Sequence, residues 1–379
     1  MVKLLHTSDV HLGAKFLMLG RNAEAHRNDL KKTFSSIVTR LIEDDARFLL
    51  IGGDLFDSNA ASQEHITFVV RELKRIRGDK YAIIIPGSHD SLTRDSVYFK
   101  KEFSEINPNI ILFTNPELHL KVFPEFDITF WARPNTSNRS SKSPLDIDWT
   151  QRKKETTYNV VLAHGSVQIE GKSASDDLPI HFSDIESSRA SYIALGHWHG
   201  VQDFSRGGVT CWYSGSPEIT YQEGKGGSGS GYILEVGLEA GRTTVNPVKI
   251  SQRDFDERII DLGDIEEEET LHDKVLQDAH ENLIRVIHLV GLSVPHILVD
   301  EEQLEAAYAD NFFSLKIKNE SHLRLDVSRE KVYPPEFVSG QFFKILEERL
   351  ATAKNDEEKK IIEEALQLGL AELEGKRII

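Results

Sequence analysis

Short apolar runs alternate with helical stretches along the first hundred residues, and this alternation restricts the possible folds more than any other feature of the chain. Residues 3–7, 47–52 and 81–86 are short and apolar, which is typical of buried strands. Residues 22–45 and 62–77 lie between them and repeat apolar side chains with the period of an amphipathic helix. The alternation of strand and helix predicts an α/β fold.

Strand-like segments become more frequent after residue 109, which indicates a second sheet. Residues 133–144 are polar and rich in turn formers, and the glycine- and serine-rich stretch 224–231 predicts a flexible hairpin loop. Strands resume after both stretches, so neither marks a domain boundary. We predict two sheets packed together and flanked by helices, with the later strands at 110–113, 118–122, 128–132, 158–163, 192–195, 209–213, 232–236 and 243–250.

The pattern changes near residues 251–254, where strand spacing gives way to an acidic run at 264–269. Helix, strand, helix and strand then follow, which is the content of a small α/β module, and Pro334 and Pro335 interrupt the chain. Two amphipathic helices are predicted within 336–375. We therefore expect three parts: a two-sheet domain at 1–252, a small α/β domain at 253–332 and a C-terminal helical segment at 333–379.

The net charge of −16 is distributed unevenly, and its distribution keeps nucleic acid open as a partner. Residues 251–379 carry 16 lysines and arginines against 30 acidic residues, which leaves a net charge of only −2 for residues 1–250. Bound metal ions would let this nearly neutral part hold phosphate, because their charge dominates locally.

Cysteine usage and hydropathy predict a soluble cytoplasmic protein with no membrane-spanning segment. Cys211 is the single cysteine, which excludes a disulfide scaffold and a zinc site built on several thiolates, and which fits a reducing compartment. The apolar run at the N-terminus is too short for a signal peptide, and no run of about 18 uncharged apolar residues predicts a membrane span.

Aspartate and histidine residues recur at the ends of five predicted strands. Loops at the carboxyl ends of strands in an α/β protein converge on one crevice, so these segments are expected to be neighbours in space. Carboxylate and imidazole ligands suit divalent ions such as manganese or iron, and two ions about 3.5–4 Å apart clamp the oxygens of a phosphoryl group. The five segments are Asp9-Val10-His11, Gly53-Asp54, Gly87-Ser88-His89-Asp90, His164-Gly165 and Gly196-His197-Trp198-His199.

The order of these segments resembles that of the calcineurin-like metallophosphoesterases, whose motifs are D-x-H, G-D, G-N-H-D, H and G-H-x-H. Three stretches further resemble the SbcD-type nuclease subunit of the DNA double-strand-break repair complex: LLHTSDVHLG at 4–13, GDLFD around Asp54 and YSGSPE at 213–218. The resemblance in motifs covers residues 4–218. The rest is similar in architecture alone, a small capping domain followed by helices.

The resemblance implies two divalent metal ions, expected to be Mn²⁺, and one catalytic histidine. His89 would act as the acid–base residue that stabilises charge on the leaving sugar oxygen or protonates it. The metal ligands would be Asp9, His11 and His199 for the first ion, Asp54 between the two ions, and Ser88, His164 and His197 for the second.

Two positions depart from the family pattern. Ser88 stands where the family has an asparagine that gives an amide oxygen to the second metal, and a hydroxyl is shorter and usually a weaker ligand. Serine could bind through water or leave that ion less firmly held. Asp57 stands where some relatives carry a DNA-positioning histidine.

Other residues in these motifs have ordinary structural interpretations. Trp198 is expected to pack, Asp90 to cap a turn or act in the site, and Tyr213 to belong to a structural turn or to contact DNA. The ten remaining histidines are expected to be structural or surface residues: His6, His26, His65, His119, His181, His272, His280, His288, His296 and His322.

Three functions are compatible with this pattern. The resemblance favours a metal-dependent DNA exonuclease and endonuclease that hydrolyses phosphodiester bonds at DNA ends. A small-molecule phosphodiesterase or a phosphoprotein phosphatase would use the same metals. A DNA-end-binding scaffold whose catalysis is weakened by Ser88 is the third.

The resemblance also implies protein partners. One is a second copy of the chain, which would form a homodimer through helices of the nuclease domain. Residues 23–42 are a candidate for the dimer helix, although a buried helix would have the same periodicity. The other is a coiled-coil ABC-type ATPase of the SbcC type, docked on the C-terminal helices. Each of these helices carries one apolar stripe, which could instead pack within the chain.

Overall fold

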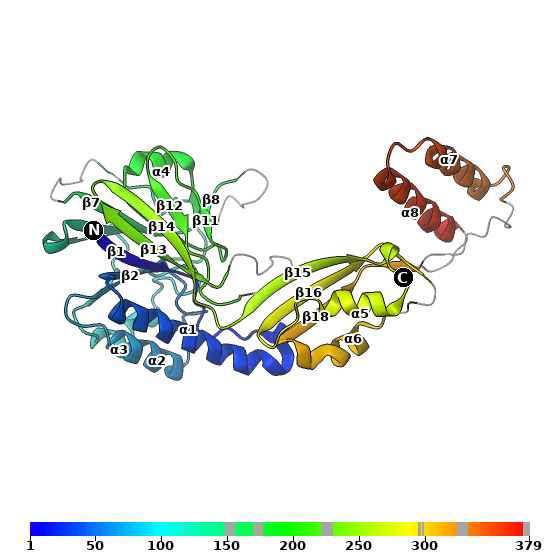
Figure 1. Ribbon diagram of the computed structural model, residues 1–379. Helices are drawn as coiled ribbons and strands as arrows, with labels where there is room; N and C mark the ends of the chain where they lie inside the picture. Colours follow the sequence, from blue (N-terminus) through cyan, green and yellow to red (C-terminus); the bar gives the residue numbers. More distant parts are fainter. Residues whose placement is uncertain are drawn as a thin grey trace. The chain divides into compact units, whose positions relative to one another are not determined.

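The structure is a computed structural model that describes residues 1–117, 119–147, 149, 156–169, 177–220, 230–294, 297, 299–323 and 333–373. It divides into two compact units, Met1–Phe255 and Asp256–Ile379 (Figure 1). The predicted loop at 224–231 and the predicted start of a strand at Leu118 lie largely or wholly outside the described residues. The three functional parts predicted from the sequence stay a prediction.

Two six-stranded sheets form the first unit, which confirms the predicted α/β fold. The first sheet has the order β14-β13-β1-β2-β3-β4, with β1 to β4 parallel. Its strands are β1 (Val2–Thr7), β2 (Phe48–Ile51), β3 (Tyr81–Ile84), β4 (Ile110–Leu112), β13 (Tyr232–Glu239) and β14 (Arg242–Lys249).

The second sheet has the order β11-β12-β10-β7-β6-β5, and β6, β7, β10 and β12 run parallel. Its strands are β5 (His119–Phe123), β6 (Ile128–Ala132), β7 (Tyr158–His164), β10 (Tyr192–Gly196), β11 (Gln202–Asp203) and β12 (Thr210–Tyr213). The short strands β8 (Ser166–Val167) and β9 (Pro179–Ile180) pair beside it.

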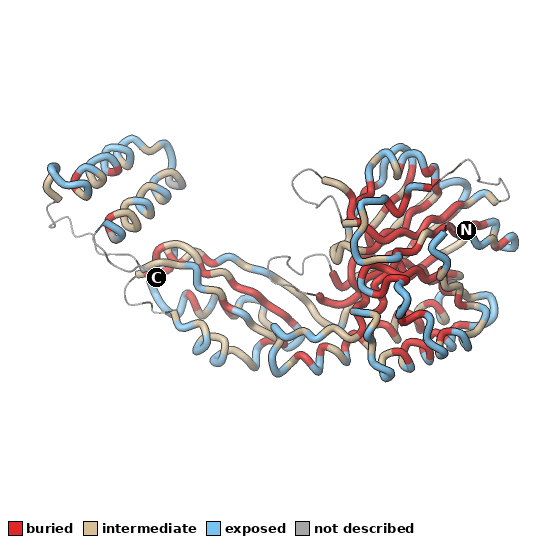
Figure 2. Tube along the Cα trace, turned by 180° about the vertical axis from the view of Figure 1, so that it is seen from behind, coloured by how far each residue is buried: buried red, intermediate tan, exposed pale blue. Residues whose placement is uncertain are grey.

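Alternating side chains of the strands build three separate cores. In β2, Phe48 and Leu50 point between the two sheets, whereas Leu49 and Ile51 pack beneath the helices on the outer face of the first sheet. In β7, Val160 faces the core between the sheets, and Val161 faces a third core beyond the second sheet. The strands of this unit are mostly buried (Figure 2) because both faces of both sheets are covered.

Helices cover the two outer faces (Figure 1). On the first sheet lie α1 (Ala23–Glu43), α2 (Gln63–Leu73) and α3 (Lys101–Ser104), and α4 (Phe182–Ser188) lies on the second. Ser62 caps α2, because its side chain accepts a hydrogen bond from the backbone N–H of His65. Leu30, Phe34 and Ile37 of α1 are fully or almost fully buried in the core beneath the sheet. Core packing therefore accounts for the apolar stripe of α1.

The second unit is a small α/β module followed by a helical hairpin. Its three-stranded sheet has the order β15-β16-β18, from β15 (Asp254–Asp261), β16 (Leu283–Val290) and β18 (Ser314–Asn319). The remaining elements are α5 (Glu268–Leu276), β17 (Leu292–Ser293), α6 (Glu301–Tyr308), β19 (His322–Leu323), α7 (Val338–Thr352) and α8 (Asp356–Leu373). The predictions missed β15, because Asp256 and Arg258 take partly buried positions while Ile259 is exposed, so apolar and polar residues do not alternate along it.

Candidate metal centre

The carboxyl ends of the parallel strands carry the predicted ligands. Asp9 and His11 follow β1, and Asp54 follows β2. The backbones of these two segments are bonded to each other, since Asp9 N donates to Gly53 O and His11 N donates to Asp54 O, both at 3.0 Å. His164 ends β7 and is paired in register with Gly196 of β10. The parallel pairing of neighbouring strands therefore brings these segments together.

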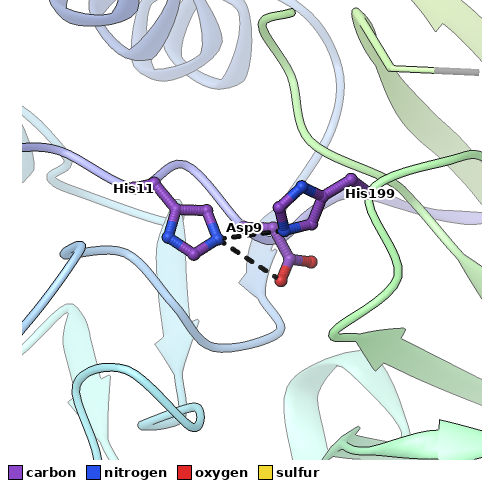
Figure 3. A group of neighbouring side chains, drawn as sticks. All are labelled: Asp9, His11 and His199. Atoms are coloured by element: carbon purple, nitrogen blue, oxygen red, sulfur yellow. Dashed lines mark hydrogen bonds and ion pairs between the residues drawn. The ribbon is translucent and has the colours of Figure 1, made fainter. Parts of the chain in front are cut away.

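Asp9, His11 and His199 form one donor group (Figure 3). One ligand atom from each lies within 4.8 Å of the others. His11 Nε2 is 3.2 Å from His199 Nε2 and 4.0 Å from Asp9 Oδ1. Asp9 and His11 are buried, and His199 is partly buried. Two imidazole nitrogens and a carboxylate that converge on one point are a donor set that fits manganese, iron or zinc.

A second donor group shares one carboxylate with the first. Asp9, Asp54 and His164 also have ligand atoms within 4.8 Å of one another. Asp54 Oδ2 is 3.3 Å from His164 Nε2 and 3.9 Å from His11 Nε2, so it faces both groups. The hydroxyl of Ser88 donates to Asp54 Oδ2 at 3.1 Å and lies 3.3 Å from His164 Nε2. Ser88 is therefore in place beside the second group.

His197 and His89 lie differently from these ligands. The backbone N–H of His197 donates to the carboxylate of Asp9, but its ring Nε2 is 3.0 Å from Asp177 Oδ2. His89 is exposed, and its Nδ1 donates to the carbonyl oxygen of Asp57 at 3.0 Å. The His89 ring packs edge-on against His11, with 4.7 Å between the ring centroids. A third group of possible ligands, His11, Asp57 and His89, adjoins the first.

The backbone around the site is held in unusual conformations. Asp9, His11 and Asp54 have φ angles of 53°, 50° and 52°, and that of His197 is 112°. Such angles are costly for residues other than glycine and persist where the surrounding structure imposes them, often at functional sites. Gly53 has a φ of 99°, which favours glycine, and the space beside it also requires glycine, because a Cβ there would lie 2.5 Å from His164 Nδ1. The site depends on this close backbone approach.

Charges within the site favour a cation between the carboxylates. Burial opposes ionisation of Asp54, yet the neighbouring imidazoles of His164 and His11 hold its pKa well below the ordinary range. Burial also opposes charge on His164, but the carboxylates of Asp54 and Asp9 raise its pKa to about 9. Burial, with repulsion from His11, lowers the pKa of His199 to about 4, so that ring is neutral and free to bind a metal.

Two residues that organise the site were not predicted. Asp177 and Thr220 are the two, and they bond the rings of His197 and His199. No sequence signal identifies Asp177 or Thr220, because about twenty residues that include strands, and α4 in the case of Asp177, separate each of them from its histidine. Asp90, by contrast, was expected to cap a turn or act in the site. It is fully buried and accepts hydrogen bonds from Gly87 N, Phe56 N and the Tyr98 hydroxyl, so it caps the turn at Gly87 and joins it to the loop after β2.

Tyr213 and Trp198 are packing residues. Tyr213 is fully buried, its hydroxyl donates to Gly165 O at 2.6 Å, and its ring stacks on Trp198. The ring nitrogen of Trp198 donates to the hydroxyl of Ser166. Two of the histidines expected to be structural are also buried and hydrogen-bonded. His6 contacts the hydroxyl of Tyr192, and His26 donates to the carbonyl oxygen of Ile219.

A two-sheet α/β sandwich with carboxylates and imidazoles gathered at its strand ends is the architecture of a metal-dependent phosphoesterase. Residues 2–201 match the calcineurin-like phosphoesterase family, and the chain belongs to that family. Its members bind divalent metal ions, and the aspartate and histidine groups described above fit such ions. No described helix is long and apolar enough to cross a membrane.

Relatives extend the similarity beyond the family motifs. The chain is 27% identical over 346 residues to the DNA double-strand break repair protein Mre11 of Sulfurisphaera tokodaii, covering 86% of this chain and 84% of that protein. It is 25% identical over 292 residues to the protein of the same name from Sulfolobus acidocaldarius, covering 74% and 72%. These matches confirm the resemblance to the group that contains Mre11 and SbcD.

The solved structures that match the chain include Vacuolar Protein Sorting 29 of Cryptosporidium parvum, at 15% identity and a TM-score of 0.31, covering 66% of this chain and 98% of that one. Wild-type Vps29 of Entamoeba histolytica complexed with zinc is 12% identical, with a TM-score of 0.26 and coverage of 66% and 100%.

Proposed function

We propose that this protein is a manganese-dependent DNA nuclease of the SbcD type, which hydrolyses phosphodiester bonds at DNA ends during double-strand-break repair. The position of Asp54 carries the proposal, because its Oδ2 faces both His11 and His164. A carboxylate in that position suits a ligand shared by two cations. Two bound divalent ions would supply Lewis acidity and would clamp the oxygens of the phosphoryl group.

The residues of the chain divide the remaining work. Asp9, His11 and His199 would hold the first ion, and Ser88 and His164 would hold the second together with Asp54. His197 is assigned to the second ion by its place in the motif alone, since its ring contacts Asp177.

His89 is suited to proton transfer. One ring nitrogen, Nδ1, is engaged with the carbonyl of Asp57, while the side chain is exposed beside His11. In the proposal, Nε2 donates a proton to the leaving sugar oxygen or stabilises its charge.

Ser88 bears on the scaffold alternative. Its hydroxyl lies within 3.3 Å of both His164 Nε2 and Asp54 Oδ2, which supports a direct contact with the second ion over a disabled site. The name of the Mre11 relatives supports DNA over a small phosphodiester or a phosphoprotein as substrate.

The C-terminal hairpin would dock a coiled-coil ABC-type ATPase of the SbcC type. Leu346 of α7 and Leu370 of α8 are buried, so part of each apolar stripe is covered within the chain. Ile345 and Ile361 remain more than half exposed, and so do Phe337 and Val338 at the start of α7. These exposed apolar residues support a helix-in-groove contact with the partner. A homodimer also belongs to the proposal, but the apolar stripe of α1 does not support it.

The decisive experiment compares substrates in one preparation. Purified protein with Mn²⁺ is given a labelled DNA duplex, a bis-aryl phosphodiester and a phosphomonoester in parallel, with Asp54→Asn as the inactive control. Cleavage of the duplex that is absent in Asp54→Asn is expected. Hydrolysis of the small esters without cleavage of DNA would refute the nuclease and support the alternative phosphoesterase, and no hydrolysis with retained DNA binding would support the scaffold.

The docking proposal has its own test. Deleting residues 336–379 should leave cleavage by the isolated protein intact while abolishing co-purification with the ATPase. A truncated protein that still co-purifies, or that unfolds, would refute the docking role and indicate that these helices are part of the fold of the second unit.

A further inference from the structure

The segment YSGSPE at 213–218 stands out in the sequence, yet the proposed reaction gives it no task. In the structure it leaves β12 and runs directly against the last metal-binding motif. Ser216 N donates to His199 O at 2.9 Å. A Cβ on Gly215, whose φ is 67°, would lie 2.6 Å from the same carbonyl oxygen. The backbone of this segment is therefore in close contact with the backbone of His199.

Thr220, two residues beyond this segment, contacts the ring of His199. Its Oγ1 lies 2.9 Å from His199 Nδ1, and its side chain is 5% exposed. The other ring nitrogen, Nε2, faces His11 Nε2 at 3.2 Å within the first donor group. If Nδ1 carries the proton and donates it to the threonine hydroxyl, the lone pair of Nε2 is left free for a metal.

The imidazoles of His164 and His11, which belong to the two donor groups described first, are arranged in the same manner. His164 Nδ1 is 2.9 Å from Gly52 O, while its Nε2 faces Asp54. His11 Nδ1 is 3.4 Å from Asp57 Oδ1, while its Nε2 faces the first group. Each ring thus has an outer acceptor on Nδ1 and an inner Nε2, which is the orientation that outer partners impose on histidine ligands.

Buried contacts fix the place of Thr220. Glu218 is 1% exposed, and its carboxylate accepts hydrogen bonds from the hydroxyl of Thr33 on α1 at 2.7 Å and from Gln252 N at 2.8 Å. The next residue, Ile219, accepts a hydrogen bond from His26 of α1 through its carbonyl oxygen. These contacts anchor the chain to α1 immediately before Thr220, whose hydroxyl then lies beside the His199 ring.

We propose that Thr220 is a positioning residue, which selects the Nε2-binding tautomer of His199 from a segment that Glu218 anchors to α1. The inference rests on the proposed metal-binding role of His199. Removing an outer partner of this kind typically weakens metal binding about 10–100-fold. A hydroxyl is a neutral partner, so a loss of about tenfold for one of the two ions is expected.

Isosteric replacement separates the hydrogen bond from packing. Thr220→Val keeps the shape of the side chain and removes the hydroxyl, and Thr220→Ser restores the hydroxyl. Thr243→Val is the matched control. Thr243 lies in β14, its hydroxyl donates to Ser191 O at 2.7 Å, and it belongs to none of the donor groups. Mn²⁺ binding to each full-length variant is measured by calorimetry. The tautomer of His199 is read from histidine ¹⁵N shifts in the metal-free protein, a signature that packing alone would not change.

Thr220→Val is expected to weaken one Mn²⁺ site about tenfold and to shift the His199 signal toward the other tautomer, with Thr220→Ser and Thr243→Val close to wild type. Unchanged affinity and an unchanged tautomer in Thr220→Val would overturn the inference. Equal weakening of both sites would also overturn it, since that result indicates collapse of the segment. A wild-type protein that binds no Mn²⁺ would instead overturn the proposed function.

Discussion

Gly53→Ala should disable the second metal site while leaving the fold in place. Gly53 has a φ of 99°, and the Cβ of an alanine there would lie 2.5 Å from His164 Nδ1 and 2.7 Å from Gly87 Cα. Favourable contacts between such atoms are about 3.5–4.0 Å. Relief of the clash therefore requires His164, or the backbone near it, to move by roughly 1 Å.

A movement of that size is large for a metal site. Ligand distances are held to about 0.2 Å, and a misplacement of 1 Å can cost about 100-fold in rate. His164 Nε2 is only 3.3 Å from Asp54 Oδ2, so the donor group has little room to adapt. We expect loss of one Mn²⁺ of two and a fall of about 100-fold in turnover. The unfavourable φ should add about 1–3 kcal/mol of destabilisation.

Gly78→Ala is the matched control for the backbone term. Gly78 has a φ of 68°, and a Cβ there would meet no atom within 4 Å. This variant should be destabilised by a similar amount yet bind Mn²⁺ and cleave DNA as wild type does. Calorimetry, duplex cleavage and thermal unfolding are measured on both. Near wild-type metal binding and turnover in Gly53→Ala would refute the reasoning, because the clash would then have been absorbed without moving His164.

Three further variants probe other parts of the molecule. His89→Gln should lower turnover about 10²–10⁴-fold while calorimetry still counts the wild-type number of ions; loss of an ion would place His89 among the ligands. Ser88→Asn should tighten one Mn²⁺ site and leave the other little changed, and unchanged affinity at both would show that the serine is no handicap. Arg285 is fully buried, and its guanidinium donates twice to Asp256 and also to Val275 O and Gln277 O. Arg285→Met should lower the free energy of unfolding of the second unit by about 3–5 kcal/mol, measured by urea unfolding. A decrease under about 1 kcal/mol would contradict a stabilising role of the Arg285–Asp256 ion pair.

Local patterns in the sequence were sufficient for most elements of the first unit. The strand at 128–132 and the start of the one at 158 coincide with β6 and β7, because a buried strand carries its apolar run within a few residues. The two helices at 22–45 and 62–77 contain α1 and α2, which end earlier than their periodicity predicts. The strand β15 was not predicted, since its partly buried positions hold the charged Asp256 and Arg258 and its exposed positions include Ile259.

The family resemblance rests on the order of the motifs, which the sequence keeps with Ser88 as the one change in the third motif, and the comparison with known families confirms it. The individual ligand roles stay predictions. The structure brings Asp9, His11, Asp54, Ser88, His164 and His199 together and turns the ring of His197 toward Asp177. Motif position alone does not specify the direction of a side chain, because its rotamer depends on contacts with residues that are distant in sequence.

The sequence by itself determined that this is an α/β protein with aspartate and histidine at its strand ends, because strand and helix periods and the order of motifs are properties of adjacent residues. Only the tertiary structure decided which nitrogen of each imidazole faces the centre. That choice depends on Gly52 O for His164 and on Thr220 for His199, and the first of these partners lies 112 residues away along the chain. Contacts over such separations arise from strand pairing and layer packing, which a local pattern does not encode.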